Sequence, residues 1–255
     1  MNRLKSHMVS KIEGEYFAPG DKSISHRLAM LGSLANGTSE FSHFLYSDDC
    51  TCTIEAFKAM GVSFTQNQTS EGNVLIVNGV GLRGLKAPKE SLNLGNSGTT
   101  MRLLLGILAG QSFESHLTGD SSLSSRPMRR VTKPLREMGA VILGPDDANY
   151  APLQIKGSEL RGIHWKNEIA SAQVKSAILL AGLFAKGETS VDEHVPSRDH
   201  TERLLGMFKA PFKKTNLKST IQKTEKLTAI QFRVPGDISS AAFFIAAAMM
   251  VPNSI

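Results

Sequence analysis

The sequence predicts an α/β fold built from three βαβαββ units, because one kind of helix opening recurs along it at regular intervals. A turn of small and polar residues precedes an apolar helical segment at four places, centred on Gly20, Asn96, Ser171 and Pro235. Such a period is typical of repeated supersecondary units. The first and last openings share the sequence Pro-Gly-Asp, at 19–21 and 235–237. We therefore expect three units, followed from Val234 by the start of a fourth.

Each unit continues with the same order of elements after its first helix. A small turn followed by β-prone residues comes at 35–39, 109–113 and 185–191. A second helix is expected shortly after Ser47, Ser124 and Ser197, because serine caps the free N–H groups of a helix start. Alternating apolar segments, such as 74–77 and 153–155, then read as strands. The order strand–helix–strand–helix–strand–strand is therefore expected three times.

The composition is that of a soluble, enzyme-like chain. At 41% hydrophobic and 20% charged residues it can bury a substantial core. Residues 1–11 are basic but lack the apolar stretch of a signal peptide, and the apolar run 243–251 is too short to cross a bilayer. Cys50 and Cys52 fall on opposite faces of an expected helix, which disfavours a disulfide or a metal site. We expect a cytoplasmic protein with reduced thiols, no metal and no membrane partner.

The net charge of +6 raises the possibility of a nucleic-acid partner. Five basic residues lie close together in the second unit: Arg126, Arg129, Arg130, Lys133 and Arg136. No row of aromatic residues accompanies them, since the chain has one Trp and three Tyr. A solvated helix face explains most of this charge, and small acidic substrates explain the rest better than nucleic acid does.

The first helix opening carries a group of side chains suited to an anion. Lys22 and Ser23 lie at a helix N-terminus, where free N–H groups and the helix dipole already favour negative charge. Arg27 follows Ser23 by one helical turn on the same face. Ammonium, hydroxyl and guanidinium groups are thus expected to converge on a phosphate or a carboxylate. Simple capping of the helix remains an alternative for Ser23, and His26 reads as a partly buried helix residue.

The other openings offer complementary groups. Gly98 would let a ligand approach the main chain without a Cβ in the way, although a tight turn alone also requires glycine. Ser171, the Ala172 amide and Gln173 supply hydrogen-bonding groups at the third opening. Arg126 and Arg198 stand at matching places before second helices. If the units pack around a pseudo-threefold axis, these groups face one side and attract anionic ligands.

Five motifs in order resemble those of the enolpyruvylshikimate-phosphate synthase (3-phosphoshikimate 1-carboxyvinyltransferase) family, over almost the whole chain. They are Pro-Gly-Asp-Lys-Ser-x-x-x-Arg at 19–27, Gly-Asn-Ser-Gly-Thr at 95–99, the segment 119–128, Ala-Ser-Ala-Gln-Val-Lys-Ser-Ala at 170–177 and Arg-Asp-His-Thr-Glu at 198–202. The resemblance implies two domains, each of three units around a pseudo-threefold axis. Residues 18–233 would form the amino-terminal domain, and 1–17 and 234–255 would be stubs of the second, truncated domain.

The resemblance also implies a reaction and its site. The enolpyruvyl group of phosphoenolpyruvate would pass to the 5-hydroxyl of shikimate 3-phosphate with release of phosphate, a step of aromatic amino-acid biosynthesis that needs no cofactor. The herbicide glyphosate would bind beside phosphoenolpyruvate. Lys22 would be catalytic and contact both substrates. Shikimate 3-phosphate would be held by Lys22, Ser23, Arg27, Ser171, Ala172, Gln173 and Arg198. Phosphoenolpyruvate would be bordered by Lys22, Gly98, Arg126 and Gln173.

The acid–base carboxylates of the family lie in its second domain, so the resemblance implies that this chain alone is inactive. Asp48, Asp49 and Asp237 fall at helix starts, where capping is their expected role. The missing carboxy-terminal domain is then the expected protein partner, and the full-length form is expected to be a monomer. Three alternatives remain: a phosphate-binding module without catalysis, an RNA-binding fragment, and UDP-N-acetylglucosamine enolpyruvyl transferase. The last uses a cysteine in a mobile loop, which Cys50 and Cys52 do not match.

Overall fold

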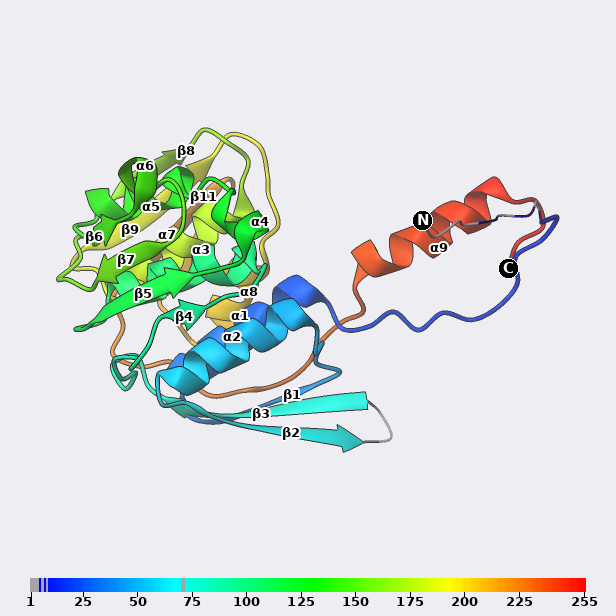
Figure 1. The fold of residues 1–255 in the computed structure, drawn as a ribbon, viewed down its shortest axis with the longest axis horizontal. Coiled ribbons are helices and arrows are strands. Elements are labelled where there is room, and N and C mark those ends of the chain that lie inside the picture. The colour runs from blue at the N-terminus through cyan, green and yellow to red at the C-terminus, as the bar shows by residue number, and fades with distance from the viewer. Residues whose placement is uncertain (1–4, 6, 8, 70–71) are drawn as a thin grey trace.

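Three four-stranded sheets surround a group of helices in the computed structural model, which describes residues 5, 7, 9–69 and 72–255. The first unit contains α1 (Lys22–Leu34), β1 (Asn36–Ser42), α2 (Asp48–Ala59), β2 (Ser63–Thr69) and β3 (Gly72–Val80). Its sheet has the order β12-β1-β3-β2. Figure 1 shows α1 and α2 lying across one face of this sheet.

The second and third units repeat this arrangement. The second has β4 (Leu92–Asn93), α3 (Gly98–Ala109), β5 (Glu114–Thr118), α4 (Ser121–Ser124), α5 (Arg129–Glu137), β6 (Val141–Leu143), α6 (Pro145–Ala148) and β7 (Leu153–Lys156), with sheet order β4-β5-β7-β6. The third has β8 (His164–Asn167), α7 (Ala172–Gly182), β9 (Glu188–Glu193), α8 (His200–Met207), β10 (Phe212–Thr215) and β11 (Lys218–Gln222), with order β10-β11-β9-β8. Apart from the opening strand of the first unit, the predicted helices and strands are present, and α4 and α6 are additions.

The expected unit order needs one correction, which concerns the opening strand of the first sheet. In the second and third units the opening strand pairs in parallel with the next strand, as β4 with β5 and β8 with β9. In the first sheet this place is taken by β12 (Gln231–Arg233), which runs parallel to β1. The strand therefore comes from the chain that follows the third unit. The chain returns to its starting sheet and completes it.

The first helices of the three units form the centre of the domain. Beyond their first turns, α1, α3 and α7 are almost entirely buried, although α1 includes the polar residues Ser25, His26, Arg27 and Ser33. The two closest of them, α3 and α7, meet at Gly106, where a Cβ would lie 2.2 Å from the Ala177 carbonyl oxygen. Only glycine allows the two backbones to approach this closely. The polar starts of these helices remain at one end of the core.

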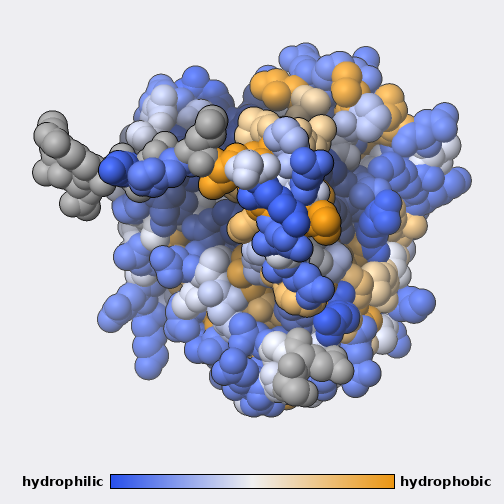
Figure 2. All heavy atoms as spheres, turned by 90° about the vertical axis from the view of Figure 1, so that its right-hand side faces the viewer, coloured by the Kyte–Doolittle hydropathy of each residue, from blue (hydrophilic) through white to orange (hydrophobic). Residues whose placement is uncertain are grey.

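The segment after β12 leaves the domain and forms α9 (Ile238–Met250), which Figure 1 shows extending away from it beside the amino-terminal segment. None of the residues of α9 is buried, and Phe243 and Met249 are 80% and 83% exposed. Tyr16 stacks on Phe244 with ring centroids 4.0 Å apart. Figure 2 views the molecule from this end and shows apolar atoms gathered there. None of the described helices is long and apolar enough to span a bilayer.

Two Pro-Gly-Asp turns join the domain to this extension. Gly20 and Gly236 form an antiparallel β-bridge. The Asp21 amide donates to the Pro235 carbonyl, and the Asp237 amide donates to the Pro19 carbonyl, each at 2.8 Å. The two Pro-Gly-Asp segments noticed in the sequence therefore pair with each other through a single β-bridge and two backbone hydrogen bonds.

Candidate active site

The N-terminus of α1 presents a half-exposed ammonium group. Asp21 caps the helix by accepting from the Ile24 amide at 2.8 Å. Lys22 Nζ lies 2.9 Å from Asp49 Oδ2, with the Lys22 side chain 47% exposed. An ion pair this open to water contributes little to stability, so the ammonium can turn to an anionic ligand at small cost. Ser23 is half-buried next to it.

Arg27 lies deeper than the sequence suggested and links three helices. Its Nε donates to Thr201 Oγ1 at 2.6 Å, its Nη2 to Ser176 Oγ at 2.9 Å and its Nη1 to the Ser23 carbonyl at 2.8 Å. The side chain is buried, and burial lowers its pKa to about 10, so it stays charged at neutral pH. A guanidinium group has five N–H donors, so two remain for a ligand. The expected convergence with Lys22 is thus partial, since the ammonium points to Asp49.

The start of α3 brings two guanidinium groups against one glycine. Ser97 caps the helix, and Gly98 follows as its first residue. A Cβ on Gly98 would lie 2.9 Å from Arg102 Nη1 and 3.3 Å from Arg126 Nη1. Arg126 donates to the Asn96 carbonyl at 3.2 Å, to the Asn96 side-chain oxygen and to Ser122 Oγ at 3.1 Å. Both guanidinium groups are hydrogen-bonded only to neutral groups in the described part of the chain.

Arg102 was not among the predicted site residues, yet it carries the second of these charges. Its Nη1 donates to Gln173 Oε1 at 3.0 Å and its Nη2 to the Pro127 carbonyl at 3.2 Å. Burial, together with the positive charges of Arg130 and Arg126, lowers its pKa to about 10. Its place one turn after Gly98 matches the place of Arg27 after Ser23, and that spacing was the signal in the sequence.

The start of α7 lies against the start of α3. Ser171 caps α7 and Ala172 is its first residue. Gln173 Nε2 donates to Thr99 Oγ1 at 3.1 Å while its Oε1 accepts from Arg102. The Gln173 side chain therefore bridges the second and third units at the level of their helix starts.

Arg198 lies just before α8 with an exposed side chain. It makes no hydrogen bond or ion pair with its side chain within the described residues. Its charge nevertheless contributes to lowering the pKa of Arg27 and of His200, which places it near both. Arg198 is therefore an exposed cation near Arg27 of α1, with its donors open to a ligand.

A chain of buried hydrogen-bonding side chains runs from α1 through α2 to the residue that caps α3. His26 Nδ1 lies 2.7 Å from Thr53 Oγ1, which lies 2.7 Å from Thr100 Oγ1, and Thr100 Oγ1 lies 2.7 Å from the capping Ser97 Oγ. Burial lowers the pKa of His26 to about 3, so the imidazole is neutral. His26 is fully buried rather than partly buried as expected, and its place in the core is structural.

A buried ion cluster supports the loop that carries Arg198. Lys175 Nζ lies 2.6 Å from Glu193 and 2.7 Å from Glu202, with all three side chains at most 2% exposed. Ser197, the neighbour of Arg198, donates to Glu193. Removing one partner of such a cluster leaves an uncompensated buried charge, which is strongly destabilising. This cluster had no clear signal in the sequence.

The carboxylates at the helix starts play the parts of caps and ion-pair partners. Asp237 caps α9 by accepting from the Ser239 amide at 2.8 Å. Capping of α2 falls to Ser47, so the capping expected of Asp48 and Asp49 is wrong, and Asp49 pairs with Lys22 instead. Both cysteines lie in α2 as free thiols, and burial raises the pKa of Cys50 to about 11. A thiol of this kind does not match a loop nucleophile.

The structure thus collects the predicted residues at the helix starts of one α/β domain made of three repeated units. Contacts link α1 to α7 and α8 through Arg27, and α3 to α7 through Gln173. Free helix N–H groups and several cations face the same end of the core, which defines a domain suited to phosphate-bearing ligands.

Comparison with known proteins gives the family. A sequence model described as EPSP synthase (3-phosphoshikimate 1-carboxyvinyltransferase) matches residues 7–255. The chain belongs to the EPSP synthase family. It is 54% identical over 246 residues to the 3-phosphoshikimate 1-carboxyvinyltransferase of Geobacillus thermodenitrificans, a match that covers 96% of this chain and 56% of the relative. It is 49% identical over 251 residues to that of Bacillus subtilis, which covers 98% and 58%.

Solved structures agree with this assignment. A structure of the EPSP synthase from Acinetobacter baumannii aligns with a TM-score of 0.87 at 47% identity, covering 96% of this chain and 54% of that one. The predicted fold class is therefore confirmed. The chain spans a little over half the length of the relatives that it matches.

Proposed function

We propose that this chain is the part of a 3-phosphoshikimate 1-carboxyvinyltransferase that receives the phosphate groups of both substrates. The observation that carries the proposal is the placing of Arg102 and Arg126 against Gly98 at the start of α3, in a member of this family. Two guanidinium groups and free helix N–H groups at one point would hold a phosphate strongly.

The two substrates would divide the face between them. The end near α1, α7 and α8 would hold shikimate 3-phosphate through Lys22, Ser23, Arg27, Ser171, Ala172, Gln173 and Arg198. The end near α3 would hold phosphoenolpyruvate through Lys22, Gly98, Arg126 and Gln173. Lys22, whose ammonium group is half-exposed, would contact both substrates and act in catalysis.

The reaction is an addition followed by an elimination. The shikimate 5-hydroxyl oxygen would attack the substituted enol carbon, which carries the phosphate oxygen, while the neighbouring carbon gains a proton. The hydroxyl proton would pass to a base in this addition, and a proton of the newly formed methyl group would then leave together with the phosphate as the double bond forms again. Fixed cations stabilise the charge that develops on the departing phosphate, and this is where Arg126 and Lys22 would act.

Proton transfer would depend on a second domain. Asp21 caps α1, Asp49 pairs with Lys22, and Glu193 and Glu202 pair with Lys175, so we propose that the acid and base come from that domain. Residues 1–17 and 234–255 would belong to it, which would account for the exposed apolar face of α9, and residues 18–233 would form the domain described above. We further propose that the protein acts in the cytoplasm on small molecules, as a monomer in its two-domain form, with neither nucleic acid nor membrane as partner.

Calorimetric titration of the chain with shikimate 3-phosphate tests this proposal. Weak, saturable binding is expected, and Arg27→Ala and Arg198→Gln should each lose a charge-assisted hydrogen bond worth about 1.5–3 kcal/mol. Lys186→Gln is the matched control, because Lys186 forms an exposed pair with Glu159 away from the helix starts. Equal affinity of wild type and both variants, or tighter binding of a UDP-sugar or a short RNA, would overturn the assignment.

A further inference from the structure

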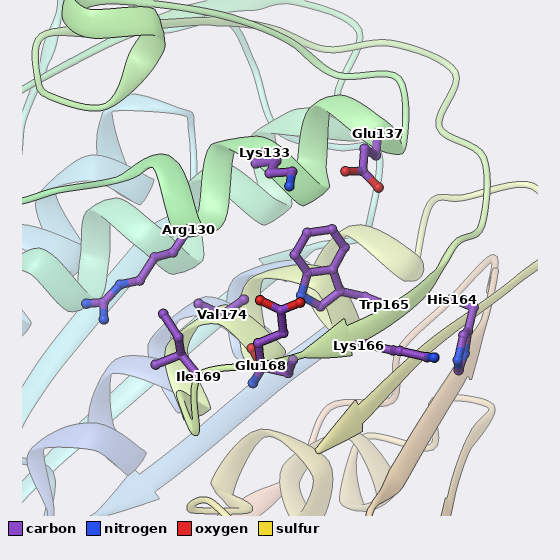
Figure 3. A pocket seen from close by; sticks show the side chains of 10 residues that line it. Arg130, Lys133, Glu137, His164, Trp165, Lys166, Glu168, Ile169 and Val174 are labelled. Carbon is purple, nitrogen blue, oxygen red and sulfur yellow. The ribbon is translucent and has the colours of Figure 1, made fainter. Parts of the chain in front are cut away.

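A cavity of about 470 Å³ lies between α5 and the segment that runs from β8 to the first turn of α7. Figure 3 shows side chains of both elements entering it, and Figure 1 places α5 and β8 well away from α9. Within the described residues, none that we assign to the substrates lines it. Its volume falls in the range of small-molecule sites in proteins.

One wall of the cavity carries two cations of α5. Arg130 and Lys133 are exposed and lie three residues apart on α5, hence on the same face of that helix. Neither forms an ion pair within the described part of the chain. Their neighbours on the helix differ, because Arg129 pairs with Asp146 at 3.0 Å and Arg136 with Asp147 at 2.7 Å. Within the described residues, Arg130 and Lys133 are therefore left without an ion pair, while Arg129 and Arg136 on the same helix are paired.

The opposite wall carries an aromatic ring and two aliphatic side chains among polar residues that include Lys166 and Asn167. Trp165 of β8 is half-buried, and Lys133 Nζ lies 5.9 Å from the centre of its ring. Val174 is buried beside it, and Ile169 is 61% exposed at the edge of the cavity. Figure 3 shows Trp165 in the middle of this group, with Lys133 above it and Ile169 and Val174 to one side. A flat ring could stack on the indole and cover the exposed isoleucine.

Two carboxylates limit the charge that such a ligand can carry. Glu137 and Glu168 also line the cavity, and both are exposed. They would repel a ligand with several negative charges, whereas Arg130 and Lys133 would hold a single one. We propose that this cavity binds a small aromatic monocarboxylate, with the carboxylate between Arg130 and Lys133 and the ring against Trp165. Arg130 also lies close enough to Arg102 to lower the pKa of that residue, so the cavity borders the proposed active site.

Tryptophan fluorescence provides a direct test, because Trp165 is the only tryptophan in the chain. The purified chain is titrated with benzoate, with excitation at the red edge of tryptophan absorption. Three further probes serve for comparison. Acetate lacks the ring, benzyl alcohol lacks the charge, and inorganic phosphate lacks both the ring and the carboxylate. Arg130→Gln and Lys133→Gln remove the two cations, and Arg129→Gln is the matched control with the same change of charge on the adjacent residue.

Of the four probes, benzoate alone is expected to cause a saturable change in fluorescence. Its affinity should fall about tenfold or more in Arg130→Gln and in Lys133→Gln and stay unchanged in Arg129→Gln. Circular dichroism verifies that the variants are folded, which these exposed positions should permit. The proposal is overturned if benzoate causes no saturable change, if acetate or phosphate reproduces or competes with its effect, or if the two cavity variants bind as tightly as the control.

Discussion

Arg102 donates to Gln173 across the interface of α3 and α7, at 3.0 Å, and thereby fixes which way the glutamine amide faces. Arginine offers only donors, so the amide oxygen must point to Arg102. The amide nitrogen then points to Thr99, to which it donates at 3.1 Å, and its second N–H is left for a ligand. A residue that the sequence did not single out thus orients one that it did.

We expect Arg102→Lys to weaken phosphate binding. Lysine keeps the charge but cannot hold Gln173 and the Pro127 carbonyl together, because it lacks the planar fork of the guanidinium. The loss should be about tenfold in the dissociation constant for inorganic phosphate, measured by calorimetry. Arg129→Lys, on the outer surface of α5, is the control. If both variants bind equally well, Arg102 has no part in the site.

Gly98→Ala should discriminate between the two ligands expected at the start of α3. The new methyl group would lie 2.9 Å from Arg102 Nη1 and 3.3 Å from Arg126 Nη1, so these guanidinium groups must shift. In a two-domain form of the enzyme, we expect the inhibition constant of glyphosate to rise more than the Michaelis constant for phosphoenolpyruvate. Steady-state kinetics measures both constants. Unchanged inhibition would mean that Gly98 serves only the turn.

The buried His26 should make stability depend on pH. Its pKa is about 3 in the folded chain and near 6.5 when exposed, so between these values the unfolded chain binds a proton that the folded chain does not. The free energy of unfolding should therefore fall as the pH decreases below 6.5, by about 1.4 kcal/mol per pH unit from this group. Above pH 6.5 His26 contributes no pH dependence.

Urea unfolding of wild type and His26→Asn across this range isolates that effect from the titration of carboxylates. The amide of asparagine can still reach for Thr53 but does not titrate. The wild type should show the steeper loss below pH 6.5. Parallel curves for the two proteins would show that His26 is protonated as easily in the fold as in water.

Residues 1–255 alone should not release phosphate from the two substrates, although the cationic face is complete. Positioned proton transfer contributes about 10²–10⁴-fold, and closure over the substrates adds the exclusion of water that one open face lacks. A coupled phosphate assay measures this directly. Adding the carboxy-terminal part of the Bacillus subtilis relative should restore activity. Phosphate release by the chain alone would place the acid and base among its own residues.

Self-association of the wild-type chain can be measured as well. Phe243 and Met249 are exposed on α9, and apolar surface of this kind promotes association. Light scattering should show oligomers that dissociate when the complementary fragment is added. A monodisperse monomer at high concentration would contradict this expectation.

Local signals in the sequence were sufficient to predict the repeated units. Ser47, Ser97 and Ser171 cap their helices through contacts within three residues, so their effect can be read from neighbouring positions. The opening strand of the first sheet could not be predicted in this way, because β12 pairs with β1 across most of the chain. Pairing over such a distance leaves no mark in the local pattern.

The candidate site divides along the same line. Lys22, Ser23 and Gly98 could be predicted as site residues because they lie at helix starts, where free N–H groups favour an anion. The pairing of Lys22 with Asp49 and the burial of Arg27 between Ser176 and Thr201 arise from how the units pack. Such contacts join side chains of different elements, so the sequence of one element could not reveal them.

The bridge between Gly20 and Gly236 also means that the chain enters and leaves the three-unit domain at one point. Bridged residues of antiparallel strands have Cα atoms about 5 Å apart. A domain whose ends lie side by side can be spliced into a surface loop of an unrelated host protein without stretching either partner. The two Pro-Gly-Asp turns are therefore the place at which this domain could be cut out and inserted into another protein as one unit.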